Sequence, residues 1–486
     1  MPESASHFGV SHASYNSHQL IILPISYRRA VAAAAAGLHV PERHPGRTVA
    51  AIGCLFVMAY AAALVGLAKP GGRIVMGDAL GHYVHLRSAV FDRDLQFRND
   101  YARLYGIEEG SEAERALAAD RTTSTGHTRN LMPVGPAILW APGFLLVAAG
   151  VWLINLFGAG YPLDGFAPAF QAVAGFSGIA AATAGTWLGY LTAARLFGAR
   201  ASIWATLAIW LSSSALYYSV ISPAYSHAAS MLAVGAFWFI WTRSLDRQDA
   251  PRYALVGATI GVAALMRWQD AVLLLVPALD VAWHWRPGRT LASAARLAAC
   301  GAAAAVAFVP QMAVWTVLYG RPFTVPQGSG FMKWHDPALW AVLVSDNHGL
   351  ISWTPVIALA LAGLVPLVRR VPLVGTAAIA AVVVSWYVNA AVWDWWGGEA
   401  FGARRFLSCY PVFILGTAAL FDRARLRTAA MAVVTLVFVG YTGLLLLQYQ
   451  TFMHGLRQVA PYPRGVVDLW LVRFRTPFDL LAWWLR

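Results

Sequence analysis

Apolar segments long enough to cross a membrane recur along most of this chain. A helix needs roughly 20 residues to cross the hydrocarbon core of a bilayer. Segments near that length cover residues 49–68, 134–157, 168–194, 201–221, 225–242, 253–266, 268–283, 291–318, 350–368, 373–392, 406–421 and 428–447. The pattern predicts an all-α polytopic membrane protein with about 11–12 transmembrane helices within a domain of residues 49–447.

One long polar insert interrupts this pattern. Residues 70–132 contain nine of the 23 acidic residues of the chain and no apolar segment long enough to span. The insert directly follows the first predicted span. We therefore expect a long first extracytoplasmic loop that carries interfacial helices, in a protein that acts at the far face of the membrane.

Composition and charge agree with a membrane location. The chain is 58% hydrophobic and 12% charged, whereas a soluble domain has about 25% charged residues. Its net charge of +13 comes from arginines in short loops, namely Arg28, Arg29, Arg43, Arg47, Arg195, Arg200, Arg243, Arg247, Arg252, Arg286, Arg289, Arg369, Arg370, Arg423, Arg425 and Arg427. This distribution is typical of positive-inside topology and argues against a nucleic-acid partner. It predicts an integral membrane protein with a cytoplasmic N-terminal tail (1–48) and an extracytoplasmic amphipathic C-terminal tail (448–486), and the resemblance described below further implies the bacterial inner membrane.

One apolar segment conflicts with this topology. If 134–157 and 168–194 both cross, Arg195 and Arg200 fall outside and every later loop inverts. Because 134–157 opens with a proline-rich turn, we expect it to form a re-entrant or interfacial helix that does not cross fully. A local exception to the charge rule is the alternative.

The polar insert opens with candidate catalytic residues. Asp78, His82 and His85 have the spacing i, i+4 and i+7, which places them on one face of a helix. One interpretation makes Asp78 a general base that accepts a proton from an attacking hydroxyl. A second makes the three residues a metal site. A third makes them a helix cap followed by the solvent-exposed face of an interfacial helix.

A D-x-D triplet follows at Asp92-Arg93-Asp94. In sugar transferases such a triplet can hold a divalent ion that bridges a phosphate. The triplet is also common in loops, and turn formation with Asn99 and Asp100 is the alternative. A divalent cation, Mg or Mn, therefore stays open as a cofactor.

Two later loops, 319–348 and 393–406, combine basic and aromatic side chains. Arginine offers paired donors to a phosphate, and tryptophan faces stack on sugar rings or anchor helices at the headgroup level. Adjacent arginines on the outer face favour a phosphate site. The candidate substrate-binding residues of the chain are His82, Arg87, Arg321, Lys333, His348, Glu399, Arg404 and Arg405.

Polar residues also stand at the outer ends of two apolar segments, as Tyr225-Ser226-His227 and Arg267-Trp268-Gln269-Asp270. Polar groups at such depth normally face a protein cavity rather than lipid. These residues either line the site or pair with one another, and the pattern leaves both possibilities open.

Several short motifs occur in order across residues 70–410. They are Gly77-Asp78, Leu86-Arg87-Ser88, Phe91-Asp92, Asp94-Leu95, Asn99-Asp100-Tyr101, Met132-Pro133, Gly135-Pro136-Ala137, Leu139-Trp140-Ala141-Pro142, His348-Gly349-Leu350, Ser352-Trp353-Thr354-Pro355, Trp396-Gly397-Gly398 and Phe401-Gly402-Ala403-Arg404-Arg405-Phe406. Together with an early span and a long first loop, they resemble the GT-C glycosyltransferases. The resemblance is to the bacterial branch grouped with the protein O-mannosyltransferases and the aminoarabinose transferases of lipid A.

The resemblance implies a GT-C fold, a polyprenyl-phosphate-linked sugar as donor, and inverting transfer to a cell-envelope glycan, lipid or protein on the extracytoplasmic face. It maps the base onto Asp78 and the lipid-phosphate site onto Arg404 and Arg405. The chain departs from the family pattern in two ways, both near Asp78. His82 and His85 stand where tyrosines are expected, and no second acidic residue adjoins Asp78. The metal requirement therefore stays open.

Two other classes of function compete with a transferase. A membrane transporter or flippase of a lipid-linked or polar substrate would need polar residues deep within several spans, whereas here they cluster at one end of the spans. A catalytically inactive scaffold of an envelope complex would not depend on Asp78. The sequence identifies neither the sugar nor the acceptor.

Overall fold

The computed structural model describes residues 37–66, 72–108, 110–113, 115–116, 122–453, 455–456, 459 and 463–486. Among these residues there are helices, turns and two isolated bridges, but no strand. The predicted all-α class is therefore confirmed for the described part of the chain. Residues 1–36, most of the predicted N-terminal tail, lie outside it.

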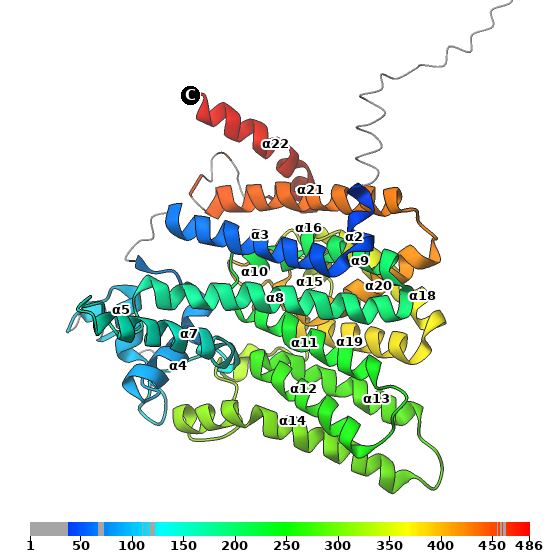
Figure 1. Ribbon diagram of the computed structural model, residues 1–486, viewed down its shortest axis with the longest axis horizontal. Helices are drawn as coiled ribbons and strands as arrows, with labels where there is room; N and C mark the ends of the chain where they lie inside the picture. Colours follow the sequence, from blue (N-terminus) through cyan, green and yellow to red (C-terminus); the bar gives the residue numbers. More distant parts are fainter. Residues whose placement is uncertain are drawn as a thin grey trace, which may run out of the picture.

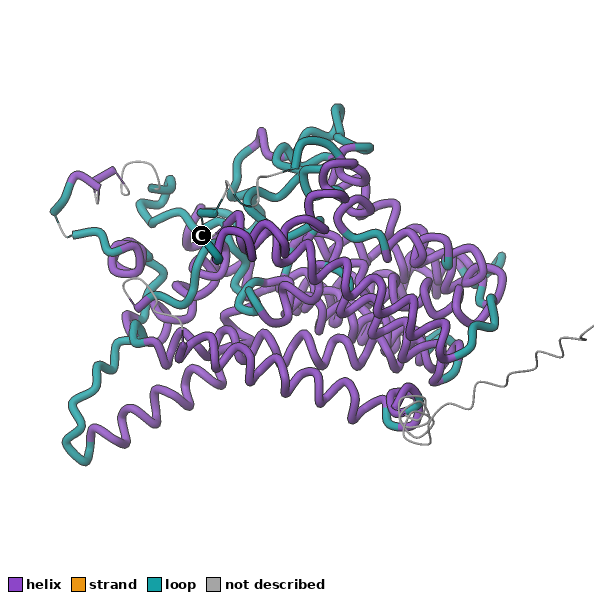
Figure 2. The backbone as a smooth tube through the Cα atoms, turned by 90° about the horizontal axis from the view of Figure 1, so that it is seen from above, coloured by secondary structure: helices purple, strands orange, loops and turns teal. Residues whose placement is uncertain are grey.

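The long helices run side by side in one bundle (Figures 1 and 2). The first part of the chain forms α2 (Val40–Arg43), α3 (Pro45–Gly66), α4 (Asp78–Arg87), η2 (Ser88–Asp92), α5 (Arg98–Tyr105) and α7 (Gly135–Asn155). The middle part forms α8 (Pro168–Phe197), α9 (Ala199–Leu211), α10 (Ser214–Val220), α11 (Ser226–Arg243), α12 (Ala250–Met266), η3 (Trp268–Leu274), α13 (Leu275–Trp283) and α14 (Thr290–Tyr319). The last part forms η4 (Ser329–Phe331), α15 (Ala341–Val344), α16 (Leu350–Trp353), α17 (Val356–Ala362), α18 (Leu364–Arg370), α19 (Pro372–Ala390), η5 (Arg404–Cys409), α20 (Tyr410–Arg423), α21 (Thr428–Met453) and α22 (Val466–Trp484).

Glycines let the helices of the bundle approach closely. A Cβ added at Gly416 of α20 would lie 2.1 Å from the carbonyl oxygen of Ala360 in α17. One added at Gly257 of α12 would lie 2.0 Å from the carbonyl oxygen of Cys300 in α14. Such contacts are typical of membrane helices, whose association depends on close packing rather than on expulsion of water.

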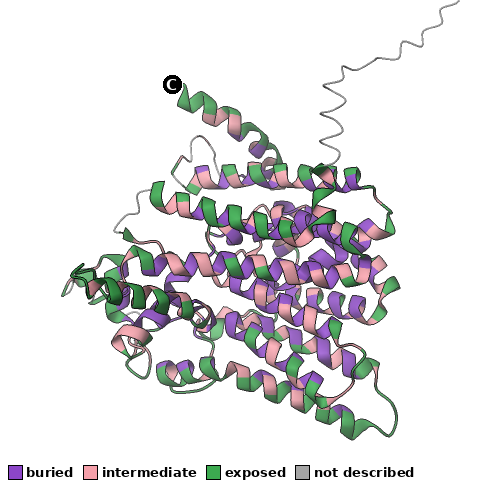
Figure 3. Ribbon diagram, viewed as in Figure 1, coloured by how far each residue is buried: buried purple, intermediate pink, exposed green. Residues whose placement is uncertain are grey.

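Many residues of the outer helices are exposed (Figure 3), and several of these are large and apolar. Val65 of α3, Leu291 of α14 and Leu436 of α21 are 90%, 86% and 63% exposed. Among the described residues, six helices are long and apolar enough to cross a membrane, or up to seven if the bent pair α9–α10 is one span. These features indicate an integral membrane protein, while the count of about 11–12 spans stays a prediction.

Helix α7 has the length and composition of a span, and its first half contacts the end of α12 and the start of α8. Its first residue, Gly135, lies against the backbone of Leu265 near the end of α12. Farther along, Phe144 packs against Phe170 at the start of α8, with ring centroids 5.1 Å apart. The chain then turns back into α8 beside α4 and α5 (Figure 1). The expectation that 134–157 does not cross fully stays a prediction.

The polar insert carries short helices, as predicted, but α4 does not lie on a solvent-exposed surface. Every residue from Ala79 to Arg87 is buried. The Tyr83 ring contacts Phe144 of α7 at 5.9 Å between centroids, and its hydroxyl donates to the Gly165 carbonyl at 2.5 Å. The interpretation of α4 as an interfacial helix with an exposed polar face is therefore wrong, because α7 and the loop before α8 cover it.

The C-terminal tail forms α22, which packs one side on α21. Helix α21 continues to Met453, past the predicted domain boundary at residue 447. Arg473 of α22 is fully buried, with its guanidinium carbon 3.8 Å from the centroid of the Tyr441 ring. Farther along α22, Phe478 and Trp484 are exposed.

Gly416→Ala should destabilise the protein by about 1–3 kcal/mol, because its Cβ would collide with the backbone of α17. The matched control is Gly440→Ala in α21, where nothing lies within 4 Å of an added Cβ. The control should be neutral or gain up to about 1 kcal/mol from helix propensity. Thermal unfolding of both purified variants in detergent measures the difference, and equal midpoints would contradict the close packing.

Candidate functional site

An ion pair between Asp78 and Arg404 lies at the end of the bundle that carries the polar insert. Asp78 begins α4 and Arg404 begins η5, so the pair joins two distant parts of the chain. Nη1 of Arg404 lies 2.8 Å from Oδ2 of Asp78. The Asp78 side chain is 33% exposed and that of Arg404 is 14% exposed. A ligand can therefore reach the carboxylate, whereas the arginine is largely covered.

A tight turn before α4 fixes the position of Asp78. Gly77 has φ 56°, in the left-handed region that favours glycine, and a Cβ there would lie 2.2 Å from the Tyr225 hydroxyl oxygen. The Tyr225 ring in turn faces Arg404, whose guanidinium carbon is 5.5 Å from the ring centroid. Burial, with a smaller contribution from the Asp78 carboxylate, raises the pKa of Tyr225 to about 12. Its phenol therefore stays protonated at neutral pH.

The loop 393–403, which we call the arginine loop, wraps around two neighbouring arginines. Arg405 donates to the Asp394 carboxylate at 2.8 Å and to the Asp394 carbonyl at 2.6 Å. Arg404 donates to the Gly397 carbonyl at 3.0 Å. Gly397 has φ 81°, which allows this tight curl. The loop thus keeps the two guanidinium groups adjacent.

A third arginine lies beside this pair. Arg267, between α12 and η3, contacts His227 at the start of α11 and donates to Oε1 of Gln269 at 2.9 Å. Gln269 donates to the Arg405 carbonyl at 2.8 Å, which ties Arg267 to the arginine pair. Behind them, the buried Asp270 carboxylate accepts hydrogen bonds from two serine hydroxyls. Three guanidinium groups therefore gather near Asp78, a constellation suited to binding a phosphate.

The two histidines of the predicted helix face lie in the protein interior. His82 is 0% exposed and His85 2% exposed. Their rings donate to backbone carbonyls, His82 to Pro133 at 2.8 Å and His85 to Met132 at 3.1 Å. Burial lowers the pKa of both to about 4, so both are neutral at neutral pH. The structure places His82, a predicted substrate ligand, where it supports the chain before α7.

Two further predicted substrate ligands are also internal. Arg87 is 6% exposed; it pairs with Asp92 and lies 3.3 Å from the Asp100 carboxylate. His348 is 4% exposed and donates to the Trp396 carbonyl at 2.9 Å. Burial lowers the pKa of His348 to about 4. Both side chains shape the loops that surround the site.

The D-x-D triplet makes its contacts within its own loop. Asp92 accepts a hydrogen bond from Asn99 at 2.8 Å, while Asp94 accepts from Ser88 at 2.6 Å and from the Gln96 N–H at 3.1 Å. In the described part of the chain, no group of three or more His, Cys, Asp or Glu side chains is placed to hold a metal ion. The geometry therefore favours the turn interpretation of Asp92 and Asp94.

A small pocket opens beside the ion pair, and we call it the Asp78 pocket. It measures about 270 Å³ and is lined by Asp78, Tyr101, Tyr105, Arg129 and Asn130 among other residues. The rings of Tyr101 and Tyr105 stack with centroids 6.1 Å apart. Small-molecule pockets typically measure about 300–1,000 Å³, so this one accommodates part of a substrate.

The remaining predicted ligands lie at the periphery. Lys333 and Glu399 are exposed, and the backbone around Lys333 pairs with the chain just before the arginine loop. Arg321 lines a separate groove of about 780 Å³ between α12, η3 and α14, with Trp268 and Trp315 on its walls. We call this feature the apolar groove, because most of its lining side chains are apolar.

Tyr225 and Arg267 are site residues that sequence reasoning left undecided. The signal was present, since both stand at the outer ends of apolar segments, where polar groups normally face a cavity. The sequence did not indicate which residues these two side chains contact. In the structure, Tyr225 faces Arg404, and Arg267 is connected through Gln269 to Arg405.

Lowering the pH from 7 to 4 should remove the stability that a buried neutral His82 contributes. His82 has a pKa of about 4 when folded but about 6.5 when unfolded, so the unfolded chain binds more protons in this range. Stability then falls as pH falls, by up to about 3 kcal/mol from His82 alone. In thermal unfolding, His82→Phe should flatten this dependence, whereas the exposed control His335→Gln should keep it. Equal slopes for all three proteins would contradict a buried neutral His82.

Comparison with known protein families and with curated proteins finds no match to this chain. The candidate site is therefore defined by its geometry. It consists of an accessible carboxylate, three arginines and the small Asp78 pocket, with an apolar groove whose wall includes Trp268, the residue next to Arg267.

Proposed function

We propose that this protein is a membrane glycosyltransferase of the GT-C type. It moves a sugar from a polyprenyl-phosphate carrier to a cell-envelope acceptor on the extracytoplasmic face. The observation that carries the proposal is the pairing of the accessible Asp78 carboxylate with Arg404, beside Arg405 and Arg267. A carboxylate can serve as general base, and clustered guanidinium groups bind phosphate. A reaction with a phosphate leaving group needs both functions side by side.

The ion pair links donor binding to activation of the base. A phosphate offers more acceptor oxygens than one carboxylate, and arginine binds it through two donors at once. Donor binding would therefore draw Arg404 from Asp78 toward the phosphate. The carboxylate, already 33% exposed, is then free to accept a proton.

Asp78 takes the proton of the acceptor hydroxyl as the hydroxyl oxygen attacks the anomeric carbon. The bond between that carbon and the phosphate oxygen breaks, and its electron pair leaves with the polyprenyl phosphate. Attack from the opposite face inverts the configuration. Arg404, Arg405 and Arg267 stabilise the charge that develops on the phosphate, and such preorganised charges supply much of the rate acceleration.

The apolar groove offers a place for the lipid chain of the donor. Its walls include Phe308 and Trp315 of α14, and Arg321 lies at its lining. Trp268 also lines it and is adjacent in sequence to Arg267 of the arginine cluster. A chain bound in the groove would keep its phosphate near the arginines.

Asp78→Asn should lower sugar transfer by about 10²–10⁴-fold, because the amide cannot accept the acceptor proton. The variant should fold but unfold at a lower temperature, because the largely covered Arg404 loses its charged partner, so transfer is measured well below that unfolding midpoint. The assay is release of radiolabelled sugar from polyprenyl-phosphate sugars by purified protein. The matched control is Asp336→Asn, which changes an exposed carboxylate of another loop and should transfer at the wild-type rate.

Two outcomes of this assay would contradict the proposal. Retained turnover in Asp78→Asn would remove Asp78 from the role of base. If wild-type protein in liposomes moves labelled donor across the bilayer but transfers no sugar, the protein is a flippase rather than a transferase.

Filling the apolar groove should weaken donor binding without changing the chemistry. Ala305→Trp places a large ring in the groove, so we expect KM for a polyprenyl-phosphate sugar to rise at least tenfold while kcat changes little. Ala298→Trp is the matched control, because Ala298 is equally exposed on α14 but lies outside the groove lining. An unchanged KM in Ala305→Trp would place the lipid chain elsewhere.

A further inference from the structure

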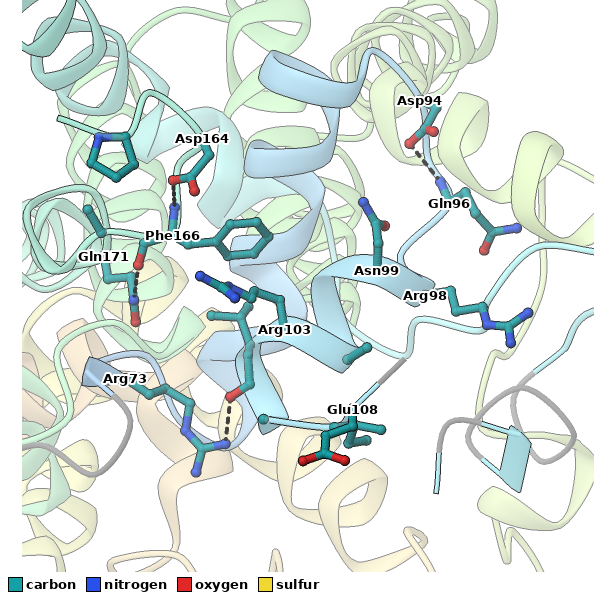
Figure 4. Close-up of a pocket in the computed structure, with 16 residues that line it drawn as sticks. Arg73, Asp94, Gln96, Arg98, Asn99, Arg103, Glu108, Asp164, Phe166 and Gln171 are labelled. Carbon is teal, nitrogen blue, oxygen red and sulfur yellow. Dashed lines mark hydrogen bonds between the residues drawn. The ribbon is translucent and has the colours of Figure 1, made fainter. Parts of the chain in front are cut away.

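A second, larger cleft lies on the other face of α5, and we call it the loop cleft (Figure 4). Tyr101 and Tyr105 line the Asp78 pocket, whereas Ala102 and Arg103 line the loop cleft. The volume of the loop cleft is about 1090 Å³. Its charged lining residues are Arg73, Arg98, Arg103, Asp94, Glu108 and Asp164.

Internal hydrogen bonds hold the walls of the loop cleft in place. Gln171, at the start of α8, accepts from the Ile74 N–H at 2.8 Å and donates to the Phe166 carbonyl at 2.6 Å. Arg73 donates to the Leu104 carbonyl at 3.0 Å (Figure 4). The chain before α4, helix α5 and the loop before α8 are thus fixed relative to one another. A site with fixed walls loses less conformational entropy when it binds a ligand.

The lining of the loop cleft matches a neutral ligand rich in hydroxyl groups. Its three arginines and three acidic residues cancel in formal charge, so the lining does not select a strongly anionic ligand. Gln96 and Asn99 add amide donors and acceptors. A sugar hydroxyl both donates and accepts hydrogen bonds, and a lining that mixes guanidinium, amide and carboxylate groups satisfies both needs.

The size and position of the loop cleft indicate an extended ligand that reaches the reaction centre. Its volume exceeds the range of about 300–1,000 Å³ typical of small-molecule pockets. Only α5 and the adjoining chain separate it from the Asp78 pocket. Arg73 connects the two, because it lines the cleft while its guanidinium carbon lies 5.6 Å from the centroid of the Tyr105 ring.

We propose that the loop cleft binds the body of the acceptor, and that this acceptor is a neutral glycan of at least about three sugar units. Its terminal hydroxyl then reaches Asp78 while the preceding units occupy the cleft. That the glycan is an acceptor rests on the proposed transferase function. Glycan binding by the loop cleft is a separate property that can be measured on its own.

The test is binding of full-length protein in detergent to defined probes. The probes are neutral oligosaccharides of one to six units, uronic-acid oligosaccharides of equal length, and serine- and threonine-containing peptides. We expect a neutral oligosaccharide of three or more units to bind. Arg103→Ala should weaken that binding at least tenfold, as should Ala102→Trp, which fills the cleft. The matched control Arg115→Ala, an exposed arginine of the same insert outside the cleft lining, should bind as wild type.

Several results would overturn the inference. They are binding only to acidic oligosaccharides or peptides, no binding to any probe, and neutral-glycan affinity unchanged in Arg103→Ala. Because Arg103 is exposed, that variant decides the question even if Ala102→Trp fails to fold. Asp78→Asn should bind the neutral glycan normally. If the wild-type protein binds the glycan but transfers no sugar, the result would contradict the transferase proposal and still support glycan binding by the loop cleft.

Discussion

The ion pair between Asp78 and Arg404 is the interaction on which the functional end of this molecule depends. A largely covered guanidinium needs a negative partner, because desolvating an unpaired charge costs several kcal/mol. Asp78 provides that partner from the start of α4, and Tyr225 covers the arginine from the start of α11. The arginine loop supplies a further acceptor through the Gly397 carbonyl. The Arg404 guanidinium thus holds together segments that are far apart in the sequence.

The sequence identified residues of this centre but not their contacts. Asp78 and Arg404 were identified separately, from their positions in outer loops, and the structure pairs them. The helical spacing of Asp78, His82 and His85 was also correct, since all three lie on α4. Sequence periodicity predicts which residues share one face of a helix, but it does not predict which other element covers that face. Because α7 packs on α4, the histidines became interior residues that support the chain before α7.

The same limit applies to the other elements around the site. Arg87 has the composition of a phosphate ligand, but its partners are Asp92 and Asp100 of its own insert. Local sequence cannot distinguish an internal ion pair from a ligand site. The course of α7 was difficult to predict for a different reason. Its length and hydropathy match a span, and only the charges of the neighbouring loops indicated that it does not cross fully. In the structure the first half of α7 contacts Leu265 and Phe170, and its course through the membrane stays a prediction.

Contacts at the opposite end of the bundle bear on the proposed orientation. Glu42, just before α3, accepts hydrogen bonds from Trp204 of α9 and from Thr428 at the start of α21. Arg370, at the end of α18, donates to the Leu196 carbonyl near the end of α8. The arginine-rich turns next to these helices therefore lie at one end, away from Asp78. The positive-inside rule predicts that this end faces the cytoplasm, which is consistent with the proposed extracytoplasmic site.

Charge balance gives a physical reason for the base of the proposed reaction to be a carboxylate. Without ligand, Arg404 pairs with Asp78, Arg405 with Asp394, and Arg267 lies within electrostatic range of Asp270. In the proposed reaction, a phosphodiester donor brings one negative charge, and the departing lipid phosphate gains another. The proton that Asp78 takes from the acceptor removes one negative charge at the same moment. Negative charge then passes from Asp78 to the phosphate while the total within the arginine cluster stays constant, so the low-dielectric site need not accommodate a new net charge.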